Sequence, residues 1–202
     1  MTKEEEILAA AEDEFFRNGY DATSTATIAG RAGVTHAMVN YYFRTKEQLF
    51  FKIIDTHIQG FLGSLKKVML AEGDFIQVLK GAATALFDKI REDRKFPFII
   101  LDISRTHPEF LERYRETVVT LCRESIKRHA QRLAEQIQAG KVANCTMENI
   151  FETVLDLATA PFLKIPFLEK IFGYDEEMID RYLQSRREDI METIKRKYAI
   201  KP

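Results

Sequence analysis

The sequence predicts an all-α protein with two parts, a small N-terminal domain of three short helices and a larger C-terminal helical domain, about nine helices in all. Apolar residues recur at helical spacing along most of the chain. The five prolines and nine glycines lie mostly between these periodic segments. No hairpin signal of the Asn-Gly or Asp-Gly type stands between alternating apolar stretches, so we expect no strands.

Composition limits the classes of protein to which this chain can belong. Its 202 residues are 46% hydrophobic and 30% charged, which is typical of a globular protein of one or two domains. The net charge of -1 means that nucleic-acid binding would depend on a local basic patch. Cys122 and Cys145 fit neither a disulfide framework nor a zinc motif, and we expect free thiols. The N-terminus is acidic and no apolar signal segment follows, so we expect a cytoplasmic protein.

Capping residues divide the N-terminal stretch into four helices. Thr2 and Glu5 have the spacing of a capping box at the start of the first helix. Asn18-Gly19 is expected to end that helix, because glycine adopts the left-handed conformation without strain. The other expected starts are residues 23–25 for the second helix, Thr35 for the third, and Thr45 with Gln48 for the fourth.

Longer periodic segments occupy the rest of the chain. The expected helices are residues 74–92, 98–106, 108–139, 146–161 and a last one that starts after residue 175. Residues 161–173 form an apolar segment interrupted by proline, to which we assign no regular structure. The expected domains are residues 1–46 and residues 47–202.

Two short helices joined by a tight turn at Gly33, and packed against a longer first helix, have the pattern of a helix-turn-helix. The stretch ILAAAEDEFFRNGYDATSTATIAGRAGVTHAMVNYYFRTKEQLF, residues 7–50, closely resembles the DNA-binding domain of TetR-family transcriptional regulators. The elements that carry the resemblance are AA…F…GY…T in the first helix, IA..AGV across the second helix and the turn, and YYF..KE.L before the fourth helix. The rest of the chain is similar to the family only in its pattern of longer helices.

The resemblance implies that the third helix is the recognition helix, which enters the major groove of DNA. It implies base-edge contacts from Thr35, His36, Ala37, Met38 and Asn40 and phosphate contacts from Tyr41, Tyr42 and Lys46, with Thr25 as a further DNA-binding candidate. Tyrosine hydroxyls and a lysine suit phosphate, and asparagine can bind adenine through two hydrogen bonds. The family more often has tyrosine at the position of Asn40, so the role of this residue stays open between base and phosphate contact.

Charge in this region amounts to a small basic footprint. Residues 31–52 have a net charge of +3, from four basic residues, Arg31, Arg44, Lys46 and Lys52, and one acidic residue, Glu47. The first helix is acidic at its start, where the family often has a basic residue. We therefore expect a modest non-specific affinity for DNA.

In the TetR family the longer helices form a domain that binds an effector and joins two subunits, which implies two further sets of residues. The expected effector pocket is rich in aromatic side chains and poor in charge, and its residues are Phe61, Leu65, Phe87, Asp102, Ile103, Phe110, Tyr114, Cys122, Phe151 and Thr159. Asp102 has an alternative role as a surface residue paired with Arg105. The expected dimer interface consists of Leu155, Ile179, Tyr182, Leu183, Arg186, Ile190 and Ile194.

These expectations describe a DNA-binding transcriptional regulator. The leading hypothesis is a repressor that binds a palindromic operator as a homodimer and leaves it when a small, largely apolar effector binds. Two alternatives stay open: a protein of the same fold without an effector, and an enzyme or scaffold that has lost DNA binding. The sequence has no nucleophile elbow, phosphate loop, dinucleotide fingerprint or zinc motif, so we expect no enzymatic activity, cofactor or metal.

Overall fold

The computed structural model describes residues 2–69 and 73–200, apart from the side chains of residues 65, 67–69, 122 and 125. The described residues form ten α-helices and, instead of a sheet, a single isolated bridge between Val142 and Ala199. The predicted all-α class is confirmed. None of the described helices is long and apolar enough to cross a membrane. The chain forms two compact units, unit 1 (Met1–Gly60 with Phe98–Arg113) and unit 2 (Phe61–Pro97 with Tyr114–Pro202).

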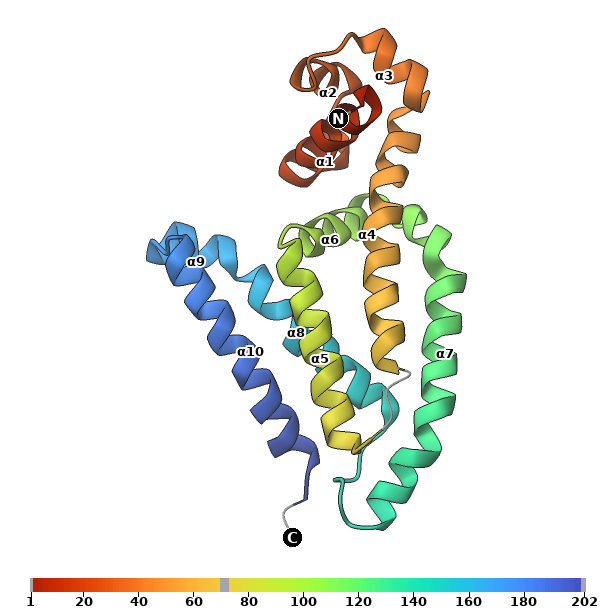
Figure 1. Ribbon diagram of the computed structural model, residues 1–202, viewed down its shortest axis with the longest axis vertical. Helices are drawn as coiled ribbons and strands as arrows, with labels where there is room; N and C mark the ends of the chain where they lie inside the picture. Colours follow the sequence, from red (N-terminus) through yellow and green to blue (C-terminus); the bar gives the residue numbers. More distant parts are fainter. Residues whose placement is uncertain (1, 70–72, 201–202) are drawn as a thin grey trace. The chain divides into compact units, whose positions relative to one another are not determined.

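Unit 1 contains the three N-terminal helices and parts of three others: α1 (Lys3–Ala22), α2 (Thr25–Arg31), α3 (His36–Phe43), α4 (Lys46–Met69), α6 (Phe96–Thr106) and α7 (Glu109–Gln138). Helix α2 packs on both α1 and α3 (Figure 1). The core of the unit includes Ile7, Ala11, Phe15, Ile28, Val39, Leu49, Phe50 and Ile54. Helices as short as α2 and α3 are unstable alone, so burial of these side chains is what holds them in place.

The predicted caps of unit 1 form as expected. The hydroxyl of Thr2 accepts from the Glu5 backbone N–H at 3.2 Å, and the Glu5 carboxylate accepts from the Thr2 N–H at 2.8 Å. Ser24, within the predicted hydroxyl cluster, caps α2, and Thr35 caps α3. Each cap satisfies a backbone donor that the first turn of a helix leaves unpaired.

Helix α1 ends later than the sequence indicates. Gly19 has a positive φ of 81°, which glycine adopts without strain, but its ψ of 171° only interrupts the helix, and helical backbone resumes as far as Ala22. The hydroxyl of Thr23 lies 2.8 Å from the Gly19 carbonyl and 3.1 Å from the Glu14 carbonyl. This buried hydroxyl ties the extra turn back to the body of α1, a long-range contact that no local pattern predicts.

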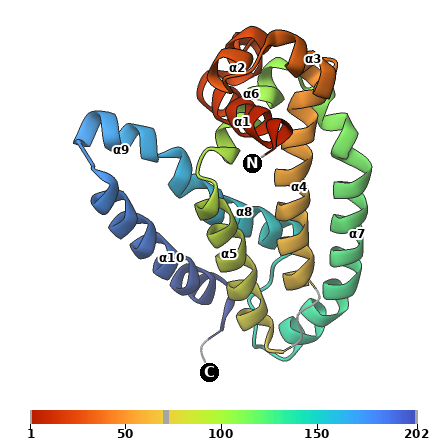
Figure 2. The same ribbon diagram turned by 45° about the horizontal axis from the view of Figure 1, so that its top comes forward.

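Unit 2 is built on three helices that lie side by side, α5 (Phe75–Glu92), α8 (Met147–Leu163) and α10 (Glu176–Tyr198) (Figures 1 and 2). Side chains from all three form one core, which includes Phe75, Leu86, Phe87, Ala158, Phe162, Leu183 and Ile194. Asp74, Thr146 and Asp175 cap these helices, at the starts that the sequence indicates.

A further helix, α9 (Ile165–Phe172), occupies the segment to which we assigned no regular structure. Pro161 lies in the last turn of α8, where its missing N–H removes one intrahelical hydrogen bond close to the end of the helix, and Pro166 lies in the first turn of α9, where that N–H would be unpaired in any case. Gly173 ends α9 with a left-handed φ of 68°. The two prolines therefore place the break between α8 and α9 without preventing either helix.

The apolar stripe of α10 belongs to the core of its own unit. Ile179, Leu183, Ile190 and Ile194 are each at most 2% exposed. This corrects the prediction that these four residues form the dimer interface, because a side chain buried within its own chain has no surface left for a partner. A core assembled from three helices needs a wide apolar face on each of them, and α10 uses its stripe for that purpose.

Candidate nucleic-acid interface

Helix α3 is held on one side and open on the other. Val39 and Phe43, one turn apart, are buried in unit 1. On the open side Thr35, His36, Ala37 and Asn40 are exposed and Met38 is half-buried. Tyr41 is 82% exposed and Tyr42 is 40% exposed, with their rings edge to face at 5.3 Å. The helix therefore presents aromatic and hydrogen-bonding groups that its own chain leaves uncovered.

A chain of polar contacts connects α2 to α3 on this open side. The Thr25 hydroxyl lies 2.8 Å from Nε2 of His36, and Nδ1 of His36 lies 3.4 Å from the side-chain nitrogen of Asn40. His36 and Asn40 are four residues apart, which places them on one face of a helix. That spacing is visible in the sequence, whereas the contact with Thr25 depends on how α2 packs against α3.

Lys46 has partners within its own chain. Its ammonium donates to the Tyr20 carbonyl at 2.9 Å and lies 4.2 Å from the centre of the Tyr20 ring. The lysine thus joins the first residue of α4 to the last turn of α1 by a charge-assisted hydrogen bond and a cation–π contact. Its expected phosphate contact stays a prediction.

The corner between α3 and α4 contains an unusual backbone conformation. Arg44, which ends α3, has φ 53° and ψ -52°, the only positive φ at a non-glycine residue in the described chain. Such a conformation costs about 1–3 kcal/mol and persists only where surrounding contacts hold it. Thr45, next in the chain, accepts a hydrogen bond from the Gln48 N–H at 3.1 Å and so starts α4 as predicted. No sequence pattern indicates the strain at Arg44.

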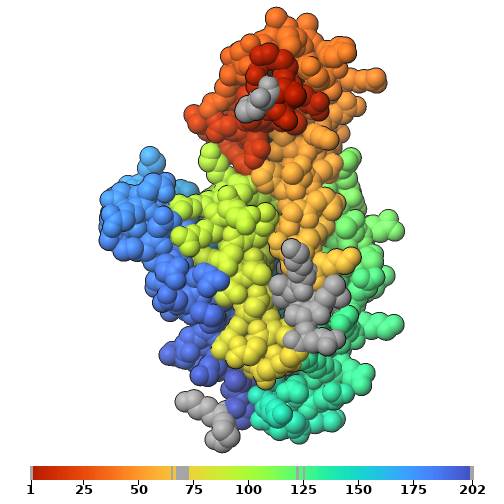
Figure 3. Space-filling view, in the orientation of Figure 1, coloured from red at the N-terminus to blue at the C-terminus, as the bar shows by residue number. Residues whose placement is uncertain are grey.

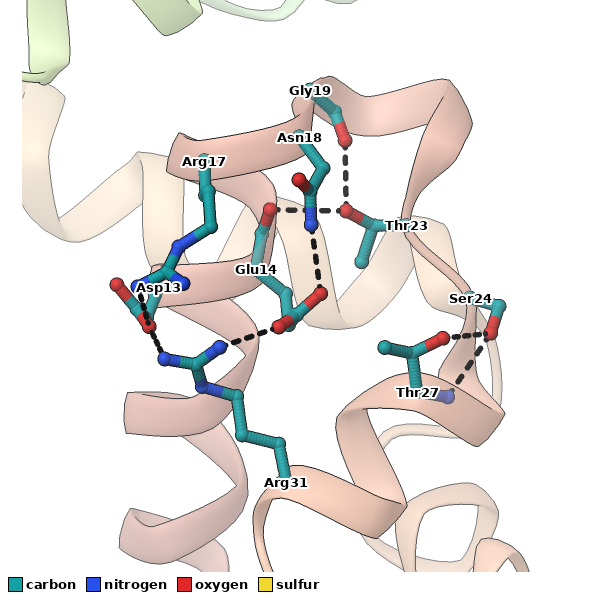
Figure 4. Close-up of polar contacts among 9 residues, drawn as sticks. All are labelled: Asp13, Glu14, Arg17, Asn18, Gly19, Thr23, Ser24, Thr27 and Arg31. Carbon is teal, nitrogen blue, oxygen red and sulfur yellow. Dashed lines mark hydrogen bonds and ion pairs between the residues drawn. The ribbon is translucent and has the colours of Figure 1, made fainter.

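Arg31 is paired inside unit 1 and does not belong to the free basic surface. Its guanidinium donates to the Glu14 carboxylate at 2.7 Å and also pairs with Asp13 (Figure 4). Glu14 is 6% exposed and receives a second hydrogen bond from the Asn18 amide at 2.9 Å. This corrects the predicted footprint, since Arg31 neutralises carboxylates of α1 and holds α2 against that helix.

The last turn of α1 is enclosed by aromatic side chains. The Tyr20 ring lies edge-on to Phe50 at 4.8 Å and to Phe110 at 5.1 Å. His107 stacks on Phe110 at 4.8 Å and hydrogen-bonds Asp21 at 2.8 Å and Glu109 at 3.0 Å. These hydrogen bonds, first the one to Asp21 and then the one to Glu109, raise the pKa of His107 above its ordinary value of 6.5.

Asp102 also lies against the end of α1. Its carboxylate is so close to Gly19 that a Cβ built at that glycine would be 2.8 Å from Oδ2. Its other oxygen is 3.5 Å from the Arg105 guanidinium, the surface pair that we considered as an alternative. Asp102 therefore contacts helix α1, and the structure favours this role over that of a polar anchor for an effector.

The other expected pocket residues are divided between the two units. Ile103 is buried in unit 1, and Phe110 belongs to the aromatic group around Tyr20. In unit 2, Phe87 packs on Phe162 with ring centres 4.8 Å apart, Tyr114 is buried, Phe61 and Thr159 are half-buried, and Phe151 is exposed. The side chains of Leu65 and Cys122 lie outside the described residues. The pocket stays a prediction.

Three of the expected interface residues keep surface of their own. Leu155 on α8 is 37% exposed, and Tyr182 and Arg186 on α10 are half-buried. Helix α9 lies at the surface of unit 2 (Figure 3) and carries more exposed apolar residues than the prediction included, namely Phe167, Ile171 and Phe172. The predicted interface did not include these three residues, because no helix was expected in residues 161–173.

Comparisons with known proteins agree with this architecture. Residues 7–53 match the model of the bacterial regulatory proteins of the tetR family. The transcriptional activator FasR of Mycolicibacterium smegmatis is 30% identical over 88 residues, 44% of this chain and 40% of FasR. The chain spans less than half the length of the curated relatives that it matches.

Solved structures extend the likeness beyond the N-terminal helices. The ketosteroid transcriptional regulator KstR2 of Mycobacterium tuberculosis has a TM-score of 0.69 at 13% identity, over 99% of this chain and 96% of that one. The fatty acid degradation regulator FadR of Bacillus halodurans has a TM-score of 0.57 at 20% identity, over 96% and 95%. At these identities the likeness shows the fold alone. The match over residues 7–53 shows that the N-terminal helices resemble those of the tetR family of bacterial regulatory proteins, and the solved structures show that nearly the whole chain shares the fold of these regulators.

Proposed function

We propose that this protein is a transcriptional regulator that binds operator DNA through α3. The observation that carries the proposal is the asymmetry of α3, which is anchored by Val39 and Phe43 while Asn40, Tyr41 and Tyr42 are exposed. A helix held in this way offers side chains to the major groove without first having to order itself. The match of residues 7–53 to the tetR family supports the same assignment.

Binding to duplex DNA tests the proposal. Wild-type protein is expected to enrich a palindromic sequence from a random duplex library, and fluorescence anisotropy then gives its affinity. Asn40→Ala is expected to relax preference at one base pair, at a cost of about 1–3 kcal/mol if the amide binds adenine through two hydrogen bonds. Tyr41→Ala is expected to weaken all duplexes alike.

The matched control is Asn144→Ala, which changes an exposed asparagine in a loop of unit 2 and is expected to leave binding unchanged. Failure of the wild type to enrich any sequence would contradict the proposal and favour an enzyme or scaffold of this fold.

Two subunits are needed to contact a palindrome, and we place their interface on α8 and α10. Phe151 and Leu155 are exposed one turn apart on α8, and the Arg186 guanidinium lies 5.9 Å from the Tyr182 ring on α10. Exposed apolar and aromatic residues and arginine are enriched at the centres of interfaces, and both helices offer such residues.

Light scattering measures the assembly. The wild type is expected at twice 23.4 kDa at micromolar concentration. Leu155→Asp is expected to shift the mass toward one chain, and Leu101→Asp, which changes an exposed leucine of unit 1, is expected to leave the dimer intact. A wild-type mass of one chain would contradict the dimer.

For regulation we propose repression, relieved by a small apolar effector. Two solved structures of the same fold are named a fatty acid degradation regulator and a ketosteroid transcriptional regulator, and fatty acids and ketosteroids are largely apolar compounds. FasR is named as an activator, so an experiment must distinguish repression from activation. A reporter fused to the regulated promoter does this, because deletion of the regulator's gene raises expression from a repressed promoter and lowers it from an activated one.

Thermal unfolding with long-chain fatty acids and with steroids tests the effector. A ligand at a hundred times its Kd adds about 2.7 kcal/mol of stability, and it is expected to release the operator as well. If neither class stabilises the protein or releases DNA, the alternative of a regulator without a small-molecule effector gains support.

A further inference from the structure

We infer that His36 is a positioning residue which, together with Thr25, fixes the side-chain amide of Asn40 in the orientation that binds adenine. The inference rests on the proposed function, because it concerns how α3 selects a base. It starts from the three-residue chain on the open side of α3, in which Thr25 contacts His36 and His36 contacts Asn40.

The atoms in contact determine where the ring proton lies. A neutral imidazole has one N–H donor and one bare nitrogen that accepts. The side-chain nitrogen of Asn40 can only donate, so Nδ1 of His36, which faces it at 3.4 Å, must be the bare nitrogen. Nε2 then carries the proton and donates to the Thr25 hydroxyl at 2.8 Å. A hydroxyl can donate or accept, so the Thr25 contact fits this tautomer and holds the ring in place, while the Asn40 nitrogen that faces Nδ1 selects the tautomer.

This arrangement leaves Asn40 with the groups that adenine requires. One N–H of its amide is used by His36, and the second N–H and the carbonyl oxygen have no partner in α3 or in Thr25. Adenine presents an acceptor at N7 and a donor at its N6 amino group in the major groove, which match one N–H and one carbonyl. An amide turned by half a rotation would place its oxygen against Nδ1, where two acceptors repel each other.

The location of the three residues supports a positioning role for His36. Thr25 is the first residue of α2 and His36 is the first residue of α3, so their contact joins the N-terminal ends of the two helices. Asn40 lies one turn further along the exposed side of α3. The fixed amide loses less freedom on binding, which favours the correct base over the others.

The first arm of the test is spectroscopic and uses the free protein. Nitrogen NMR of His36 in alkaline buffer, where the ring is neutral, is expected to show the proton on Nε2. Asn40→Ala, which removes the donor that faces Nδ1, is expected to reduce the population of that tautomer. A proton on Nδ1 in the wild type would overturn the inference.

The second arm measures preference at every base pair of the selected half-site. Asn40→Ala is expected to lower the preference for adenine at one pair by about fivefold or more. His36→Phe, which keeps a ring but no acceptor, and Thr25→Val are expected to lower preference at that same pair. His36→Gln, which retains both a donor and an acceptor, is expected to restore part of it. The control Thr56→Val makes the same change on an exposed part of α4 and is expected to change no preference.

The outcomes separate this inference from the proposed function. If the wild type selects a sequence but His36→Phe alters a different base pair, or none, then DNA binding stands and the positioning role is overturned. If the wild type selects no sequence, the proposed function fails and the positioning role fails with it.

Discussion

Helices α3 and α10 both carry residues that the sequence singles out for contact with a partner, and the structure treats them in opposite ways. Tyr41 on α3 is 82% exposed, whereas Ile179 and Leu183 on α10 are fully buried in their own unit. Helix α3 has only eight residues, and two buried side chains, Val39 and Phe43, hold it in its unit. The long helix α10 is one of three that build a core, so its apolar stripe is used within the chain before any partner can reach it. Polar and aromatic residues on a short helix are thus a better sign of a binding surface than an apolar stripe on a long one.

The largest effect is expected from the stripe of α10. Ile190→Ala removes a side chain that is 2% exposed and is expected to lower the free energy of unfolding by about 2–5 kcal/mol in urea denaturation. Ile171→Ala changes an exposed isoleucine of α9 and is expected to cost less than about 0.5 kcal/mol. Equal costs at the two positions would contradict the burial of Ile190 in the core and the exposure of Ile171 at the surface.

The second effect concerns how α2 is held. Arg31→Ala leaves the buried Glu14 carboxylate without its ion pair and is expected to destabilise the protein by about 1–3 kcal/mol. Arg17→Ala removes an exposed partner of the neighbouring Asp13 and is expected to change stability by about 0.5 kcal/mol or less. Thermal unfolding of both variants compares them, and a larger cost for Arg17 would mean that the Arg31 pair does not fasten α2.

A third change separates the two contacts assigned to Lys46. If its ammonium reaches phosphate, Lys46→Ala is expected to weaken binding to operator and random DNA alike and to lower the slope of log affinity against log salt by about one. Lys66→Ala, on an exposed part of α4, serves as the control. An unchanged slope, with lower stability, would show that Lys46 acts only through Tyr20.

The smallest effect is expected at His107 and depends on pH. Because the carboxylates of Asp21 and Glu109 raise its pKa in the folded protein, protonated His107 stabilises the fold fully below its ordinary pKa of 6.5 while those carboxylates stay ionised. That contribution is lost as pH rises through the raised pKa. The stability gap between wild type and His107→Gln should therefore shrink from mildly acidic to alkaline buffer. A gap that grows with pH would contradict the assignment, and solvent screening keeps the effect small.

The sequence predicted unit 1 well because its local signals agree with one another. The capping box at Thr2, the cap at Thr35 and the positive φ of 63° at Gly33 each depend on residues within a turn of themselves. The helical spacing of the residues after Thr35 also indicated which side of α3 is exposed. A resemblance covering residues 7–50 then gave that side a role.

What the sequence could not predict depends on contacts between distant segments. Arg31 was counted as free because its partners on α1 lie 17 and 18 residues away. Asp102 approaches Gly19 across unit 1, and a helical pattern contains no information about that approach. The buried stripe of α10 depends on how α5 and α8 pack, since an amphipathic helix shows that one face is covered but not which surface covers it.

Footprinting of the bound operator with hydroxyl radicals tests the central claim most directly. A dimer that places two copies of α3 in successive major grooves is expected to protect two equivalent patches roughly 34–36 Å apart, related by the symmetry of the site. The Asn40→Ala variant is expected to protect the same two patches on the operator and to protect operators with a mismatched base pair as well. A single protected patch would contradict the dimer, and a footprint unchanged by substitutions at both Tyr41 and Asn40 would show that another surface binds the DNA.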